Sequence, residues 1–139
     1  MIWKQRPSAA PPLDELRAIH AAKTGALIRA SVQLGAILGG ARPAVRRAFS
    51  RYGAALGLCF QITDDLLDAA HEDGAGSDRE RGKATYPAVL GMAEAERHAH
   101  RAARQARAAL LRFGTKAAVL HHLARTVEER IEKQPAAPE

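Results

Sequence analysis

The chain has 139 residues, of which 47% are hydrophobic and only 4% aromatic, so it has the length of one domain or less, with a modest core of Ala, Leu, Val and Ile. Its single cysteine excludes an internal disulfide, and it has neither a secretory h-region nor an uninterrupted apolar run of about 18 residues, so we expect a cytoplasmic protein without a membrane span. The net charge of +6 would suit a nucleic acid, but no aromatic residues interleave with the arginines for base stacking, so we expect a solvated basic face and no nucleic-acid partner.

Residues 1–12 contain three prolines and cannot continue a helix, so we expect a flexible lead-in there. Beyond it, Ala, Leu, Arg, Glu and Gln dominate long spans with few strand-like alternations, which predicts an all-α fold. Apolar residues at helical spacing predict a helix over residues 13–38 that ends at Gly39 and Gly40. Gly25 interrupts this pattern, where it would permit a local kink or a close approach of another backbone.

A second, long helix is predicted over residues 43–68, with a proline in its first turn. Gly53 and Gly57 lie one turn apart in this helix, and they would let a neighbouring helix approach closely. Cys59 belongs to an apolar run and is expected to be buried. Turn-forming residues then predict a loop over residues 71–82, beside the end of the long helix.

Two further helices are predicted near the end of the chain, over residues 93–113 and 115–133. Gly114 separates them, and Thr115 is a candidate cap for the second. We therefore expect one helical unit over residues 13–133, followed by a proline-containing tail over residues 134–139.

The end of the long helix carries four polar side chains on one face. At about 100° per residue, Gln61, Asp64, Asp65 and Asp68 fall within a quarter of the helix circumference. Carboxylates at i and i+4 repel each other, so this face gains stability when a cation binds between them. Hard oxygen ligands suit Mg²⁺, which keeps several waters and completes its shell with phosphate oxygens. The same pattern also fits an alternative interpretation, a solvated acidic helix face without a metal.

Three short motifs occur in a fixed order around this face: Lys23-Thr24-Gly25, the stretch from Phe60 to Asp68, and Gly82-Lys83-Ala84-Thr85-Tyr86-Pro87. Together they resemble the trans-polyprenyl diphosphate synthases, and most closely the bacterial farnesyl diphosphate synthase group. The resemblance implies that the helices correspond to the C-terminal helices of the isoprenoid synthase helical bundle. It runs over residues 13–133 but matches only the C-terminal half of the family domain.

The resemblance implies a transferase reaction of isoprenoid biosynthesis. An allylic diphosphate ionises, the double bond of isopentenyl diphosphate attacks the cation, and a proton is lost. Mg²⁺ would neutralise the charge of the leaving diphosphate. By resemblance, Asp64 would bind Mg²⁺ directly, while Asp65 and Asp68 would support it through waters.

The resemblance also assigns roles in substrate binding and catalysis. Lys23 and Lys83 would bind the allylic diphosphate. Thr24 and Gln61 would line the place where the allylic cation forms, and their oxygen dipoles would help to hold it. The segment 71–82 departs from the family, because Asp73 stands where family members commonly have a lysine, and an anion there opposes diphosphate binding.

Only one Asp-Asp-x-x-Asp motif occurs, so the first aspartate-rich motif of the family has no counterpart in this sequence. Two hypotheses follow. The chain is the C-terminal portion of a farnesyl-type synthase, incomplete or inactive alone, and active when completed by an N-terminal half or by a full-length synthase. Alternatively, it is a non-catalytic truncated remnant or an interaction subunit of a full synthase. In both cases an apolar helix face would be exposed in isolation, so we expect association, including homo-oligomers.

Overall fold

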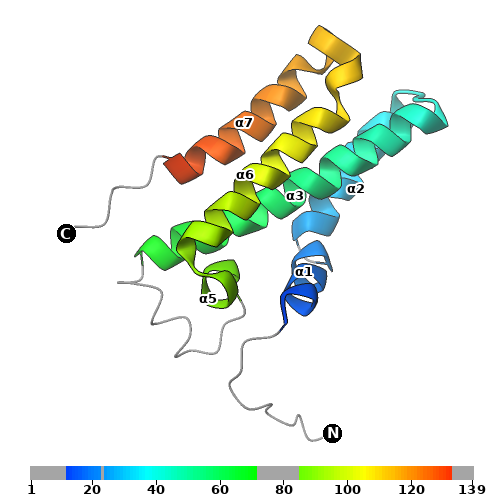
Figure 1. Ribbon diagram of the computed structural model, residues 1–139. Helices are drawn as coiled ribbons and strands as arrows, with labels where there is room; N and C mark the ends of the chain where they lie inside the picture. The colour runs from blue at the N-terminus through cyan, green and yellow to red at the C-terminus, as the bar shows by residue number, and fades with distance from the viewer. Residues whose placement is uncertain (1–11, 23, 72–84, 133–139) are drawn as a thin grey trace, which may run out of the picture.

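The computed structural model describes residues 12–22, 24–71 and 85–132 (Figure 1). The described residues form helices and turns without any strand, so the predicted all-α fold is confirmed. The predicted lead-in, apart from its last residue, the loop over 71–82, apart from His71, and the tail lie outside the described residues. The elements in chain order are α1 (Leu13–Ala22), α2 (Thr24–Leu38), α3 (Pro43–His71), α5 (Tyr86–Leu90), α6 (Met92–Ala109), the 3-10 helix η1 (Leu111–Ala117) and α7 (Ala118–Glu132).

The long helix α3 is the centre of the fold. It packs mainly against α2 and α6, and α7 covers a further side of α3 and α6 (Figure 1). Because consecutive long helices run antiparallel, the α2–α3 turn and the α6–α7 connection lie at one end of the bundle, which we call the turn end. The C-terminal part of α3, α5 and the start of α6 form the opposite end, which we call the site end.

The predicted helix over residues 13–38 is two helices, since α1 ends at Ala22 and α2 begins at Thr24. Gly25 therefore lies within α2, buried and helical. The reason is packing, because a methyl group built on Gly57 would lie 2.7 Å from Cα of Gly25. A methyl group on Gly53 would lie 2.9 Å from Cα of Arg29 in the same way. The predicted close approach of a neighbouring helix to these glycines is therefore confirmed.

The end of α2 follows the prediction. Gly40 has φ of +69°, the left-handed conformation that glycine adopts without steric cost. The N–H of Gly40 donates to the carbonyl of Ile37, and the N–H of Ala41 donates to the carbonyl of Ala36. These two bonds satisfy two of the last carbonyls of α2, where the chain turns toward α3.

The last two helices have different bounds from those expected. Helix α6 ends at Ala109, and Gly114 breaks the chain within η1, with φ of 54°. The second helix begins at Ala118, so Thr115 lies in η1 and is not its cap. The early turn lets Phe113 pack edge-on against Phe49 of α3, with 5.7 Å between ring centroids. This contact is long-range in sequence, and helical periodicity contains no signal for it.

The core consists mostly of small and aliphatic side chains, as the composition indicates. Cys59 is fully buried, as predicted, and burial raises the pKa of its thiol to about 11, so the thiol stays protonated at neutral pH. Five alanines of α6 pack into this core: Ala95, Ala99, Ala102, Ala103 and Ala106. No helix within the described ranges is both long and apolar enough to cross a bilayer.

Tyr52 joins α3 to the first turns of α7. Its side chain is fully buried, and its hydroxyl donates to the carbonyl oxygen of Leu120 at 2.8 Å. We expect Tyr52→Phe to lower the free energy of unfolding by about 1 kcal/mol, because a buried hydrogen bond is lost while the ring stays in place. Urea unfolding measures this difference, and an unchanged midpoint would show that the bond adds no net stability.

Candidate functional site

The predicted polar face lies at the C-terminal part of α3, at the site end of the bundle. The opposite side of the same turns is buried, because Ile62 and Leu66 have no exposed surface. On the polar face, Asp68 is exposed while Asp64 and Asp65 are half-buried. The carboxylates therefore lie on the side of α3 that faces away from the core, as helical periodicity predicts.

Asp64 makes a contact that the sequence does not indicate. Its Oδ1 atom accepts a hydrogen bond from Nη2 of Arg130 in α7 at 3.1 Å. The side chain of Asp64 is 41% exposed, and that of Arg130 is 39% exposed. Arg130 also lies over the ring of Phe60, with its guanidinium carbon 5.4 Å from the ring centroid. The guanidinium of Arg130 thus binds one oxygen of Asp64, the carboxylate that would bind the metal directly according to the family resemblance.

Asp65 joins α3 to the short helix α5. Its Oδ2 atom accepts a hydrogen bond from the backbone N–H of Tyr86 at 2.9 Å. Thr85 precedes α5 and caps it, since its hydroxyl accepts from the N–H of Ala88 at 3.3 Å. Pro87 lies in the first turn of α5, where its missing N–H leaves no bond unmade. Two of the motif residues, Thr85 and Tyr86, therefore form the start of α5. The hydrogen bond from Tyr86 to Asp65 connects this start to α3.

The structure describes five of the seven predicted site residues. Thr24 is the first residue of α2, and Gln61 lies half-buried on α3. The contact between Gly25 and Gly57 fixes the start of α2 one helical turn away from Gln61. Thr24 and the polar face of α3 therefore lie at the same end of the bundle. Lys23 and Lys83 lie outside the described residues.

The polar face offers few protein ligands for a metal ion. Within the described part of the chain, no three or more His, Cys, Asp or Glu side chains are grouped to hold a metal ion. Mg²⁺ needs fewer protein ligands than that, since it takes one or two carboxylates and fills its shell with waters and phosphate oxygens. A half-exposed Asp64 with an exposed Asp68 one turn away fits this mode of binding.

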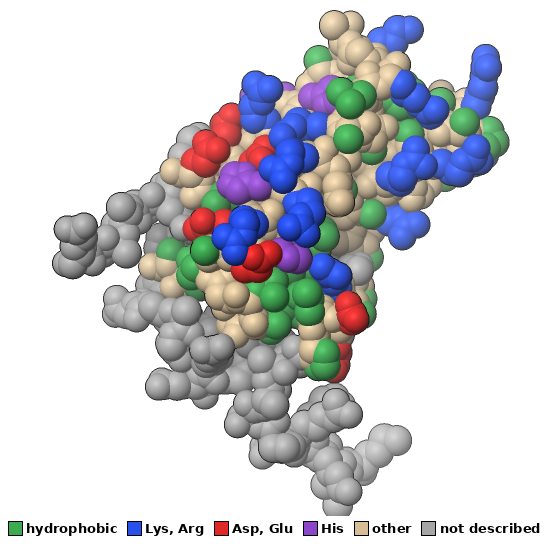
Figure 2. All heavy atoms as spheres, in the orientation of Figure 1, with side chains coloured by type: hydrophobic (Ala, Val, Ile, Leu, Met, Phe, Trp, Pro, Cys, Tyr) green, Lys and Arg blue, Asp and Glu red, His purple; other side chains and the backbone are tan. Residues whose placement is uncertain are grey.

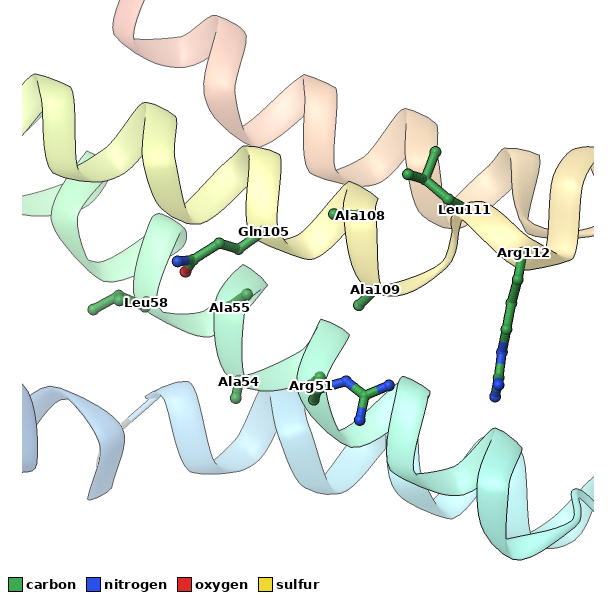
Figure 3. Close-up of a pocket in the computed structure, with 9 residues that line it drawn as sticks. All are labelled: Arg51, Ala54, Ala55, Leu58, Gln105, Ala108, Ala109, Leu111 and Arg112. Atoms are coloured by element: carbon green, nitrogen blue, oxygen red, sulfur yellow. The ribbon is translucent and has the colours of Figure 1, made fainter.

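A groove of about 790 Å³ lies between α3 and α6, toward the turn end (Figure 3). Most of the residues that line it are apolar, and its two cationic residues are Arg51 of α3 and Arg112 of η1. None of the predicted site residues lines it. The full lining is Arg51, Ala54, Ala55, Leu58, Gln105, Ala108, Ala109, Leu111 and Arg112.

Comparison with known proteins decides the family. The polyprenyl synthetase family model matches residues 1–123. The chain belongs to this family. Farnesyl diphosphate synthase of Escherichia coli (strain K12) is 45% identical over 96 residues, which cover 63% of this chain and 31% of that protein. Geranylgeranyl diphosphate synthase of Cyanophora paradoxa is 37% identical over 123 residues, which cover 85% of this chain and 41% of that protein.

Solved structures of this family share the fold. A putative farnesyl-diphosphate synthase from Marinomonas sp. MED121 is 36% identical with a TM-score of 0.73, over 87% of this chain and 42% of that one. An FPP/GFPP synthase from Zymomonas mobilis is 34% identical with a TM-score of 0.74, over 86% of this chain and 39% of that one. The polyprenyl synthetase chain described here thus spans less than half the length of these relatives.

Proposed function

We propose that this chain is the C-terminal portion of a prenyltransferase that condenses an allylic diphosphate with isopentenyl diphosphate. The observation that carries the proposal is the polar face of α3, where Asp64 and Asp68 reach solvent one turn apart beside the start of α2. Mg²⁺, when bound, would neutralise the charge that develops on the leaving diphosphate. Membership of the polyprenyl synthetase family supports this chemistry.

Each protein group has a proposed role. Asp64 binds the cation directly, and Asp68 supports it through water. Asp65 keeps the face in register with α5, because it accepts the hydrogen bond from Tyr86. Thr24 and Gln61 line the allylic cation with oxygen dipoles. Lys23 and Lys83 supply positive charge for the diphosphate.

Arg130 sets a condition on metal binding. It already pairs with Asp64, so this ion pair must open before Asp64 binds Mg²⁺. An ion pair exposed to this degree contributes at most about 1 kcal/mol, which a divalent cation readily overcomes. We therefore expect Arg130→Gln to tighten the binding of Mg²⁺ alone by up to about fivefold. Calorimetric titration measures it, and an unchanged or weaker affinity would place the cation away from Asp64.

Because the chain spans less than half of its relatives, the proposed site requires further residues for turnover. We propose that an N-terminal half or a full-length synthase supplies them, and that the isolated chain is inactive. The alternative function is a non-catalytic remnant or interaction subunit. Asp73 favours this alternative, because it places an anion where family members commonly have a lysine.

A chimera separates the two functions. Residues 13–133 of this chain replace the matching part of the Escherichia coli farnesyl diphosphate synthase, and condensation of isopentenyl with dimethylallyl diphosphate is measured. If the site is catalytic, the chimera turns over, and Asp64→Asn lowers kcat/KM by about 100-fold. Asp14→Asn on the exposed start of α1 is the matched control and should have no effect. A folded chimera without turnover would establish the non-catalytic alternative.

A further inference from the structure

Acidic residues are absent from two long spans of the sequence. No Asp or Glu occurs between Glu15 and Asp64, and none occurs between Glu96 and Glu128. The antiparallel fold brings the middle parts of both spans to the turn end. The carboxylates of α3, of the start of α6 and of the end of α7 all lie toward the site end. The bundle is therefore polarised along its length, as Figure 2 shows by the gathering of Lys and Arg side chains toward the turn end.

Six cationic side chains make up this basic end: Arg42, Arg46, Arg47, Arg51, Arg112 and Lys116. Five of them are exposed and Arg46 is half-buried. Arg112 donates to the carbonyl of Ala44 at 2.7 Å, which ties η1 to the start of α3 and joins the cations of the two turns into one surface. Within the described ranges, none of the six forms an ion pair with a carboxylate.

Large aliphatic side chains are exposed at the same end. Leu38 closes α2 with 79% of its surface exposed, Leu111 begins η1 with 70% exposed, and Val119 lies in the first turn of α7 with 79% exposed. Exposed apolar side chains at the same end as a group of Arg and Lys are the features of a surface that inserts into the headgroup region of an anionic membrane. Each cation near such a surface strengthens binding, and each inserted aliphatic side chain adds burial of apolar area.

We infer that the basic end is a docking surface for an anionic phospholipid bilayer, with Leu38, Leu111 and Val119 entering the headgroup region. A nucleic acid is disfavoured, because aliphatic rather than aromatic side chains stand among the cations and would face phosphates. The fold also keeps the acidic groups away from the membrane. Asp64 lies 21 residues after Pro43 on α3, or about 30 Å along the helix, well beyond the Debye length of about 8 Å at physiological salt.

The test is co-sedimentation of the intact chain with vesicles of phosphatidylcholine, with and without phosphatidylglycerol, at two salt concentrations. We expect binding only with phosphatidylglycerol, weakening as salt rises. The double variant Arg47→Gln/Arg51→Gln should bind about 30-fold more weakly, at about fivefold per arginine. Arg97→Gln/Arg101→Gln changes the net charge equally on the exposed side of α6, nearer the site end, and it should lose less than about threefold.

The aliphatic contribution is tested separately. Leu111→Ser/Val119→Ser should weaken vesicle binding while leaving the dependence on salt unchanged, and these exposed side chains do not contribute to the core. Three results would overturn the proposal: equal losses in the two arginine pairs, no binding to phosphatidylglycerol vesicles, or stronger binding to duplex DNA than to vesicles. The chain could instead form a dimer without lipid. If Arg47→Gln/Arg51→Gln and Asp68→Asn each dissociated that dimer, the basic end would be a contact for the site end of a second copy.

Discussion

Replacing Gly57 by alanine is expected to lower the free energy of unfolding by about 2 kcal/mol, although alanine is the better helix former. The added methyl group would lie 2.7 Å from Cα of Gly25 and 3.2 Å from its carbonyl oxygen. Both are backbone atoms of α2, so no side chain can rotate away, and α2 and α3 must separate. Chemical unfolding followed by circular dichroism measures the change.

Gly35 provides the matched control for this prediction. It lies in α2 like Gly25, but a methyl group there would meet nothing within 4 Å. Gly35→Ala should therefore raise the free energy of unfolding by up to about 1 kcal/mol through helix propensity alone. Destabilisation of similar size by both substitutions would contradict the assignment of the Gly57 effect to helix contact.

Glu128→Gln is expected to lower the free energy of unfolding by about 2 kcal/mol at neutral pH. Glu128 lies on α7 with only 14% of its side chain exposed, and it joins α7 to α6 through two partners. One carboxylate oxygen accepts from Nδ1 of His100 at 2.9 Å, and the other accepts from Arg107. The amide of the variant carries no charge and presents an N–H₂ group to one of the two donors.

The pH dependence of this effect has a definite sign. Burial alone would raise the pKa of Glu128, but hydrogen bonds from His100 and Arg107 outweigh burial and hold the pKa below its usual value of 4.5. The stability from this carboxylate is therefore present above about pH 4.5 and is lost as the pH falls through the lowered pKa. The difference between the wild type and Glu128→Gln should shrink as the solution is acidified. Glu132→Gln, on the exposed last residue of α7, should show no such trend.

Much of the fold follows from local sequence signals. The spacing of Gly53 and Gly57 predicts a close helix contact, and the structure has one at each position. Gly39 and Gly40 predict the end of α2, because a left-handed residue can satisfy its last carbonyls. Helical periodicity also predicts which side of α3 is buried, because that side carries Ile62 and Leu66. All three signals are properties of a short stretch of chain.

The remaining features depend on contacts between distant residues. Arg130 and Asp64 are 66 residues apart, and no local pattern connects them. The change to a 3-10 helix after Ala109 places Phe113 against Phe49 of α3, a contact that is likewise non-local. The helix α5 is different, since Thr85 two residues before Pro87 is a local sequence signal for a helix start. The predicted roles of the three aspartates remain predictions.

The alanines of α6 have a consequence for how rigidly the molecule holds its polar face. Alanine has no side-chain torsion to restrict, whereas a buried leucine loses about 0.5–1 kcal/mol of rotamer entropy. On the α6 side, the contact with α3 therefore forms without that loss, and the five buried alanine methyl groups have no alternative rotamers. Helices α3 and α6 should therefore move together as a rigid pair. The short helix α5 joins α6 through Gly91, so the distance between α5 and Asp65 should change little during thermal motion.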